Sequence, residues 1–299
     1  MTEQRVRSTS NLYGIHALVW VGGWSEAEAR RAIASTKEAG FDLIELAALD
    51  PATFDADLTA RLLAEHDLGV GVSLGLGEDT DVSSEDPDVV KRGRALLLNA
   101  LHLTRDVGGR YLGGVIFSRL GRYAAPVTEQ GRANSVESMA WLADEAAASG
   151  ITLGLEFCNR YETNVLNTTA QTLDFIDEVG RDNVVAHLDV YHMNIEEVSF
   201  TDAVHAAAAA GRLGYVHLGE SHRGALGTGS IPWDEFFTAL HDVGYDGVMT
   251  FESFSSEVVH PTLSSNLAIW RNTWSDGMQL ARSAREFIRT RYEEQRSQS

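Results

Sequence analysis

The feature that most constrains the fold is an alternation of short apolar runs with longer amphipathic stretches along most of the chain. Eight apolar runs predict β-strands, and they lie at Tyr13–Trp20, Phe41–Ala47, Leu68–Leu76, Tyr111–Ser118, Ile151–Phe157, Asn183–Val190, Leu213–Gly219 and Gly247–Ser253. The stretches between them carry apolar residues at three- and four-residue spacing, and several end at a glycine such as Gly150 or Gly180. Eight strand-then-helix units in 299 residues predict an α/β fold, a single-domain (β/α)8 TIM barrel.

An open, doubly wound sheet is the alternative architecture. Such a sheet usually carries a glycine-rich phosphate-binding turn after its first strand, and "VGGWSEAE" in this chain does not match G-x-G-x-x-G. We expect the catalytic barrel to occupy residues 11–290, between a disordered N-terminal tail, 1–10, and a polar C-terminal tail, 291–299.

The charge balance bears on the partners of the protein. The net charge is −19, from 24 Lys and Arg against 43 Asp and Glu. Such a surface repels nucleic-acid phosphates and anionic membranes, so we expect neither as a partner. No run approaches the roughly 18 apolar residues of a membrane span. Cys158 is the only cysteine, so no internal disulfide can form, which favours a cytoplasmic location.

Four consecutive predicted strands carry a potential metal ligand near their carboxyl ends, where TIM barrels place their active sites. These residues are Glu156, Asp189, His217 and Glu252. Each has an ordinary explanation by itself: pairing with a Lys or Arg, capping of a helix, a satisfied core histidine, and a surface charge, respectively. Core packing gives no reason for all four at one height, whereas a cation would balance the buried carboxylates. Three oxygen ligands and one nitrogen ligand suit Mn²⁺, Mg²⁺ or Co²⁺ better than a closed zinc site.

Further polar side chains follow the same strands. Glu162 lies in the loop after the fifth strand, His192 in the loop after the sixth, and Arg223 after the seventh. Loop solvation and hydrogen bonding would explain each of these alone. His16, in the first strand, faces either the mouth or the core of the barrel. The glycines of "GALGTG" lack the Lys-Ser/Thr of a P-loop, so they indicate a tight loop.

Four segments give the chain a resemblance to a known family. "EFCNRYETNVLNT", "LDVYHMNIEE", "VHLGESHRGALGTGSIPW" and "FESF" resemble the D-tagatose and D-allulose (psicose) 3-epimerases, the ketose 3-epimerases of the sugar isomerase barrel superfamily. The resemblance covers about residues 13–288. It implies a divalent metal, Mn²⁺ first, with the ligands Glu156, Asp189, His217 and Glu252. It implies substrate contacts from Glu162, His192 and Arg223.

The resemblance also implies a reaction, the inversion of C3 in a free ketose, as between D-fructose and D-allulose or D-tagatose and D-sorbose. Inversion next to a ketone needs a base on each face of the carbon, and Glu156 and Glu252 are the implied pair, acting through a cis-enediolate. Two features depart from the family: His16 stands where many members have an aromatic residue, and the loop "FSRLGRYAAP" lacks an aromatic-rich pattern. We expect both to line the distal end of the sugar, so the preferred ketose stays open.

Other functions remain open on the same barrel. They are an aldose–ketose isomerase related to hydroxypyruvate or xylose isomerases, and a metal-dependent lyase that cleaves sugars or C-glycosides. The net charge and the single ligating histidine disfavour a DNA-repair endonuclease of this superfamily. The family implies a homodimer or homotetramer. Trp270 and Trp274, one turn apart in an expected helix, suit either a subunit interface or packing on the barrel.

Overall fold

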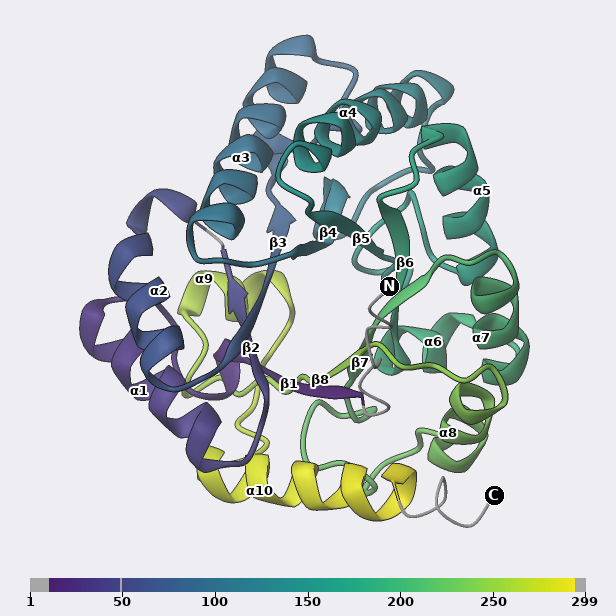
Figure 1. The fold of residues 1–299 in the computed structure, drawn as a ribbon. Helices are drawn as coiled ribbons and strands as arrows, with labels where there is room; N and C mark the ends of the chain where they lie inside the picture. Colours follow the sequence, from purple (N-terminus) through teal and green to yellow (C-terminus); the bar gives the residue numbers. More distant parts are fainter. Residues whose placement is uncertain (1–10, 49, 294–299) are drawn as a thin grey trace, which may run out of the picture.

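A computed structural model describes residues 11–48 and 50–293, which form one closed barrel of eight parallel strands. The strands are β1 (Leu12–His16), β2 (Leu43–Ala47), β3 (Gly69–Leu76), β4 (Tyr111–Arg119), β5 (Thr152–Glu156), β6 (Val184–Asp189), β7 (Leu213–Leu218) and β8 (Val248–Phe251). Strands adjacent in sequence are adjacent in the ring, and β1 pairs with β8 to close it. The predicted TIM barrel is confirmed (Figure 1).

Helices surround the ring of strands (Figure 1). They are α1 (Glu26–Glu38), α2 (Ala56–Glu65), α3 (Pro87–Asp106), α4 (Glu129–Ala147), α5 (Thr169–Val179), α6 (Val190–Glu196), α7 (Phe200–Ala209), α8 (Trp233–Asp242), α9 (Pro261–Asn266) and α10 (Gly277–Ile288). Short 3₁₀ turns are η1 (Ala17–Val19), η2 (Pro51–Thr53) and η3 (Glu78–Thr80), and η4 (Arg289–Glu293) is a π-helical turn. The last helix, α10, lies beside α1 and α8 and completes the outer layer (Figure 1).

Local sequence signals fix the helix ends. Ser25 and Glu28 form a reciprocal capping box at the start of α1, which satisfies backbone N–H groups that the helix leaves free. Helix α5 ends at Gly180, whose φ of +62° is favourable for glycine and lets its N–H bond to the carbonyl of Ile176. Capping thus marks the start of α1, and a glycine marks the end of α5.

Tyrosine rings fill the interior of the barrel below its mouth. Tyr111 stacks on Tyr215 with ring centroids 4.0 Å apart. The Tyr111 hydroxyl lies 2.9 Å from Nδ1 of His187, and the Tyr215 hydroxyl lies 2.7 Å from Oγ1 of Thr250. Gly154 makes room for this arrangement, since a Cβ there would lie 1.9 Å from the Tyr111 hydroxyl oxygen. We call Tyr111, His187, Tyr215 and Thr250 the barrel floor.

The first expected strand is shorter than the sequence indicates. It ends at His16, and residues 17–19 turn into the 3₁₀ segment η1, in which His16 Nδ1 accepts a hydrogen bond from the N–H of Leu18. His16 therefore stands at the mouth end of β1.

The prediction of a helix through Trp270 and Trp274 is wrong. Helix α9 ends at Asn266, and Ala268 takes a φ of +54°, which a right-handed helix cannot accommodate. Trp274 nevertheless packs against the core and donates a hydrogen bond of 2.8 Å to Ser253, while Trp270 is exposed. Trp274 thus contributes to packing on the barrel, whereas Trp270 faces solvent.

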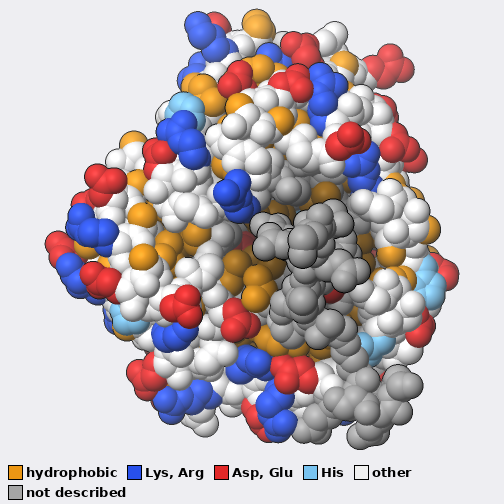
Figure 2. All heavy atoms as spheres, viewed as in Figure 1, with side chains coloured by type: hydrophobic (Ala, Val, Ile, Leu, Met, Phe, Trp, Pro, Cys, Tyr) orange, Lys and Arg blue, Asp and Glu red, His pale blue; other side chains and the backbone are white. Residues whose placement is uncertain are grey.

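The described part of the chain extends a short way past residue 290. Tyr292, in η4, is buried and stacks on His241. The expected tail 1–10 and residues 294–299 lie outside the described residues. No helix among the residues described is long and apolar enough to cross a membrane. On the face drawn in Figure 2, acidic and basic side chains are interspersed, so the net charge of −19 is not concentrated there.

Candidate active site

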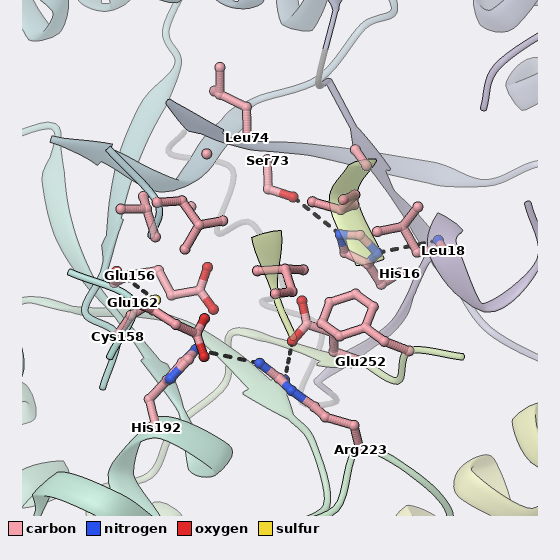
Figure 3. Close-up of a pocket in the computed structure, with 18 residues that line it drawn as sticks. His16, Leu18, Ser73, Leu74, Glu156, Cys158, Glu162, His192, Arg223 and Glu252 are labelled. Carbon is pink, nitrogen blue, oxygen red and sulfur yellow. Dashed lines mark hydrogen bonds and ion pairs between the residues drawn. The ribbon is translucent and has the colours of Figure 1, made fainter. Parts of the chain in front are cut away.

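The four predicted ligands meet at one end of the barrel interior. Each of Glu156, Asp189, His217 and Glu252 is buried and offers one ligand atom, and these four atoms all lie within 4.8 Å of one another. The Nδ1 atom of His217 lies 3.1 Å from Oε1 of Glu156 and 3.5 Å from Oε1 of Glu252. Glu156 and Glu252 approach the cavity from different sides (Figure 3). We call these four residues the acidic cluster.

Strand ends account for this convergence. Asp189 and His217 are direct neighbours in the pairing of β6 with β7, and Glu252 follows the last residue of β8. Asp189 is also the N-cap of α6: its Oδ1 accepts from the N–H of Tyr191 at 2.8 Å, while its Oδ2 faces Arg223 at 3.2 Å. The capping role and the contact with Arg223 therefore belong to different oxygens of one carboxylate.

Burial and mutual repulsion shift the protonation of the cluster. Burial raises the pKa of Asp189 to about 7, against the opposing charge of Arg223. Burial also raises the pKa of Glu156, although His217 opposes the shift. Burial disfavours the ionised form of Glu252 too, but Arg223 and His217 outweigh it and lower its pKa. Burial would lower the pKa of His217, but Glu45, Glu252 and Glu156 together raise it well above its usual value. The cluster attracts positive charge.

Arg223 is the cation that faces this cluster. Its guanidinium pairs with Glu252 and Asp189, and it lies over the rings of Tyr191 and Phe254, 3.7 and 4.9 Å from their centroids. The backbone of Arg223 adopts a φ of +61°, a conformation that is uncommon for residues other than glycine. The loop is therefore shaped to direct this one side chain into the cavity.

Glu162 and His192 line the same cavity and are joined through Asn159. The Asn159 amide donates to Glu162 at 2.8 Å, and its backbone N–H donates to Nδ1 of His192 at 3.1 Å. Burial, together with Arg223 and His217, holds the pKa of His192 well below its usual value. His192 lies in the first turns of α6, not in the expected loop, because Asp189 caps that helix directly after β6.

His16 faces the cavity from the opposite side (Figure 3). Its Nε2 lies 3.4 Å from Oγ of Ser73, and this pair is set among apolar neighbours that include Leu18 and Leu120. Leu120 comes from the "FSRLGRYAAP" loop, so both regions that depart from the family pattern line this cavity. Its volume is about 70 Å³. Cys158 also lines it, and burial raises the pKa of the thiol well above its usual value.

Two buried carboxylates were missed in the sequence. Glu45, on β2, contacts Nε2 of His217 at 2.9 Å, and the signal for it was present, since "FDLIELA" places a carboxylate inside an apolar strand as "ITLGLEF" does. Glu220 follows β7 and accepts hydrogen bonds from the N–H groups of Ser221 and Gly227 and from the indole of Trp233. It holds the tight loop that the "GALGTG" glycines indicated.

Known proteins resemble this chain over most of its length. The sequence profile of the xylose isomerase-like TIM barrel family matches residues 33–290. The L-ribulose 3-epimerase of Methylomonas sp. (strain DH-1) is 53% identical over 280 residues, covering 94% of this chain and 97% of that protein. The ketose 3-epimerase of Arthrobacter globiformis is 49% identical over 276 residues, covering 92% and 95%.

A solved structure gives the same result in three dimensions. The D-allulose 3-epimerase from Methylomonas sp., in complex with D-allulose, superimposes with a TM-score of 0.92 at 52% identity, covering 95% of this chain and 98% of that one. Family profile, whole-length identity and superposition all agree with the barrel described above. The chain therefore belongs to the xylose isomerase-like TIM barrel family and, within it, to the ketose 3-epimerases.

Proposed function

We propose that the protein is a metal-dependent ketose 3-epimerase that interconverts free ketoses by proton transfer at C3. The observation that carries the proposal is the placement of Glu156 and Glu252, which reach one imidazole nitrogen, Nδ1 of His217, from different sides of the cavity. Two carboxylates that flank one point can act on the two faces of a carbon held there. The names of the relatives give the reaction class.

The acidic cluster suits a divalent cation. Its donor set is three carboxylates and one imidazole, all buried, and Coulomb repulsion among them is relieved by a cation. Such a set suits Mn²⁺ first, with Mg²⁺ and Co²⁺ as alternatives. We propose Glu156, Asp189, His217 and Glu252 as the ligands. When bound, the cation polarises the carbonyl of the ketose and makes the C3 hydrogen more acidic.

The two carboxylates divide the proton transfer. In the cluster without a cation, burial raises the pKa of Glu156, whereas the charges of Arg223 and His217 outweigh burial and lower the pKa of Glu252. One group removes the C3 proton, the other returns a proton to the opposite face through a cis-enediolate, and the roles exchange in the reverse direction.

The neighbouring side chains orient the sugar. His192 and Arg223 offer N–H donors to the oxygens near the reacting carbon and stabilise negative charge that develops there. Glu162, held by Asn159, accepts a hydrogen bond from a sugar hydroxyl. His16 with Ser73 is the polar pair at the distal end of the cavity, and we propose it as a contact for the far hydroxyls.

Epimerisation in deuterium oxide tests the proposal. The protein is loaded with Mn²⁺ and incubated with L-ribulose, D-fructose or D-tagatose, and the products are separated by chromatography and examined by NMR. The expected result is the C3 epimer with deuterium at C3. Formation of an aldose with label at C1 or C2 would identify an isomerase, and a dehydrated or cleaved product would identify a lyase.

We also propose a homodimer or homotetramer in the cytoplasm. The family resemblance and the exposed Trp270 support association, and the single buried thiol of Cys158 suits a reducing compartment. Analytical ultracentrifugation at micromolar protein is expected to give at least twice the chain mass of 32.6 kDa. A single species at the monomer mass would contradict the association. We further propose residues 11–293 as the catalytic unit, so a chain cut to these residues should keep its activity.

A further inference from the structure

Glu45 is a fully buried carboxylate outside the acidic cluster. It lies on β2, on the far side of the barrel from β6, and no part of its surface is exposed. Its Oε1 and Oε2 lie 3.0 and 2.9 Å from Nε2 of His217. The Tyr215 hydroxyl donates a further hydrogen bond of 2.8 Å to Oε2. A carboxylate in this position needs a reason, because burial of a charge is costly without partners.

The imidazole of His217 is held between two different environments. Its Nε2 edge faces Glu45, whereas its Nδ1 edge faces Glu156 and Glu252 of the acidic cluster. An ionised carboxylate only accepts hydrogen bonds, so the contact with Glu45 requires a proton on Nε2. The nitrogen left to donate a lone pair is then Nδ1, the one directed into the cluster. The neutral ring of His217 thus offers Nδ1 to a cation, because Glu45 holds the single proton on Nε2.

The barrel floor holds Glu45 in place. Tyr215 donates to Glu45, and its own oxygen accepts from Thr250 at 2.7 Å, while stacking on Tyr111 fixes the tyrosine ring. In the pairing of β1 with β2, Glu45 is opposite His16, whose Nε2 lies 3.8 Å from Oε1. Glu45 thus connects the floor of the barrel to the one imidazole in the cluster.

We propose that Glu45 is a positioning residue for the metal site: it fixes the Nε2–H form and the ring orientation of His217, so that Nδ1 binds the cation. This inference rests on the proposed function, because it presupposes a cation in the cluster. Carboxylates that orient a metal-bound histidine typically contribute about 10- to 100-fold to metal affinity. Glu45 itself lies on the edge of the imidazole that faces away from the cluster.

The test is Mn²⁺ affinity of the full-length protein, measured from the free Mn²⁺ signal in electron paramagnetic resonance. Glu45→Gln keeps an acceptor for Nε2–H but removes the charge, and the expected dissociation constant is about 10- to 100-fold higher than in the wild type. Tyr215→Phe keeps the stacked ring but removes the donor to Glu45, and a smaller increase is expected. Asp81→Asn is the matched control, because Asp81 is also a buried carboxylate but bonds to Ser83 and Tyr123; its affinity should equal that of the wild type.

A second readout is independent of affinity. In the Co²⁺-loaded wild type, the proton on Nε2 of His217 should give a strongly shifted ¹H NMR signal that exchanges slowly with water, because Glu45 binds it in a buried site. The signal should broaden or exchange faster in Glu45→Gln and, to a smaller degree, in Tyr215→Phe. If Glu45→Gln does not fold, the Mn²⁺ affinity and the NMR signal are both measured on Tyr215→Phe.

The outcomes separate this inference from the proposed function. A folded Glu45→Gln protein with wild-type Mn²⁺ affinity and an unchanged NMR signal overturns the inference alone, as does a Tyr215→Phe protein unchanged in both readouts. Weakened binding in Glu45→Gln, with no C3 epimerisation by the wild type, supports the role of Glu45 and overturns the proposed reaction. A wild-type protein that binds no Mn²⁺, Mg²⁺ or Co²⁺ overturns both.

Discussion

The imidazole of His192 accepts a hydrogen bond of 3.1 Å at Nδ1 from the backbone N–H of Asn159. Because burial and the positive charge of Arg223 keep the pKa of His192 well below its usual value, the ring is neutral and its one proton lies on Nε2. Nε2 lies at the cavity that His192 lines, 3.5 Å from Oδ2 of Asp189. A backbone contact thus decides which atom of the ring can donate to a substrate oxygen.

This arrangement predicts different results for two substitutions of His192. His192→Gln can place an amide N–H near the position of Nε2, and we expect it to retain measurable epimerisation. His192→Leu offers no donor, and we expect kcat/KM to fall by about 100-fold, the usual effect of removing a donor to developing charge. Steady-state kinetics with L-ribulose and D-fructose check both. Equal activity of the two variants would show that the donor is not used.

Removal of the metal should affect both activity and stability. Dialysis against a chelator is expected to stop epimerisation and to lower the melting temperature, and Mn²⁺ should restore both. A ligand present at 100 times its dissociation constant stabilises the folded state by about 2.7 kcal/mol. In the Glu156→Gln control the chelator should change the melting temperature less, because one ligand is altered. Full turnover in protein shown to be metal-free by elemental analysis would sink the proposed metal dependence.

Metal affinity should depend on pH through Asp189. Burial raises the pKa of this carboxyl from 3.8 to about 7, so the folded metal-free protein keeps a proton that the unfolded chain has already lost. The stability contribution of Asp189 therefore decreases as pH rises from about 4 to about 7 and is constant above that. A cation must displace this proton, so the part of its affinity that depends on Asp189 should rise about tenfold per pH unit up to about 7 and then level off.

Titration of Mn²⁺ binding between pH 5.5 and 8.5, with urea unfolding of the metal-free protein alongside, checks both parts of the Asp189 prediction. Asp189→Asn cannot titrate and should lose the part of each dependence that this group contributes. A dissociation constant that does not change between pH 5.5 and 7 in the wild type would be inconsistent with a raised pKa at Asp189.

Glu220 should control substrate affinity through the loop that carries Arg223. Its carboxylate binds several donors of that loop, and its carbonyl accepts the N–H of Arg223 at 2.7 Å. Glu220→Gln turns an acceptor oxygen into a donor, which we expect to cost about 1–3 kcal/mol of stability. We expect KM to rise more than kcat falls, because Arg223 loses its fixed position.

Urea unfolding and initial-rate kinetics measure the effects of Glu220→Gln. The control is Asp234→Asn, which breaks an exposed ion pair with Arg291 and should change stability by less than about 1 kcal/mol. Unchanged KM and stability in Glu220→Gln would show that the glycines alone shape the loop.

The fold and most of the site could be predicted because their signals are local. The alternation of apolar runs gave all eight strands, and a carboxylate inside the apolar run of β5 identified Glu156. Glu45 carried the same signal, but the sequence did not indicate which residue it contacts. Its partner His217 is 172 residues away in the chain, and only closure of the barrel brings β2 and β7 to face each other.

Other errors arose where local and tertiary preferences compete. Trp270 and Trp274 have helical spacing, but the backbone leaves the helix at Ala268, and spacing alone does not show where a chain turns. Asn159 looks like an ordinary loop residue in the sequence. Its role depends on the position of His192, which a different strand and helix provide.

The contact between Gly154 and Tyr111 constrains the order in which this sequence can change. The tyrosine hydroxyl fills the space that any side chain at 154 would enter. Residue 111 must therefore become smaller before residue 154 can become larger without strain, because the reverse order forces the Tyr111 ring to move. Tyr111 also stacks on Tyr215, and Tyr215 donates a hydrogen bond to Glu45. A substitution at Gly154 would therefore disturb the position of the carboxylate that contacts His217.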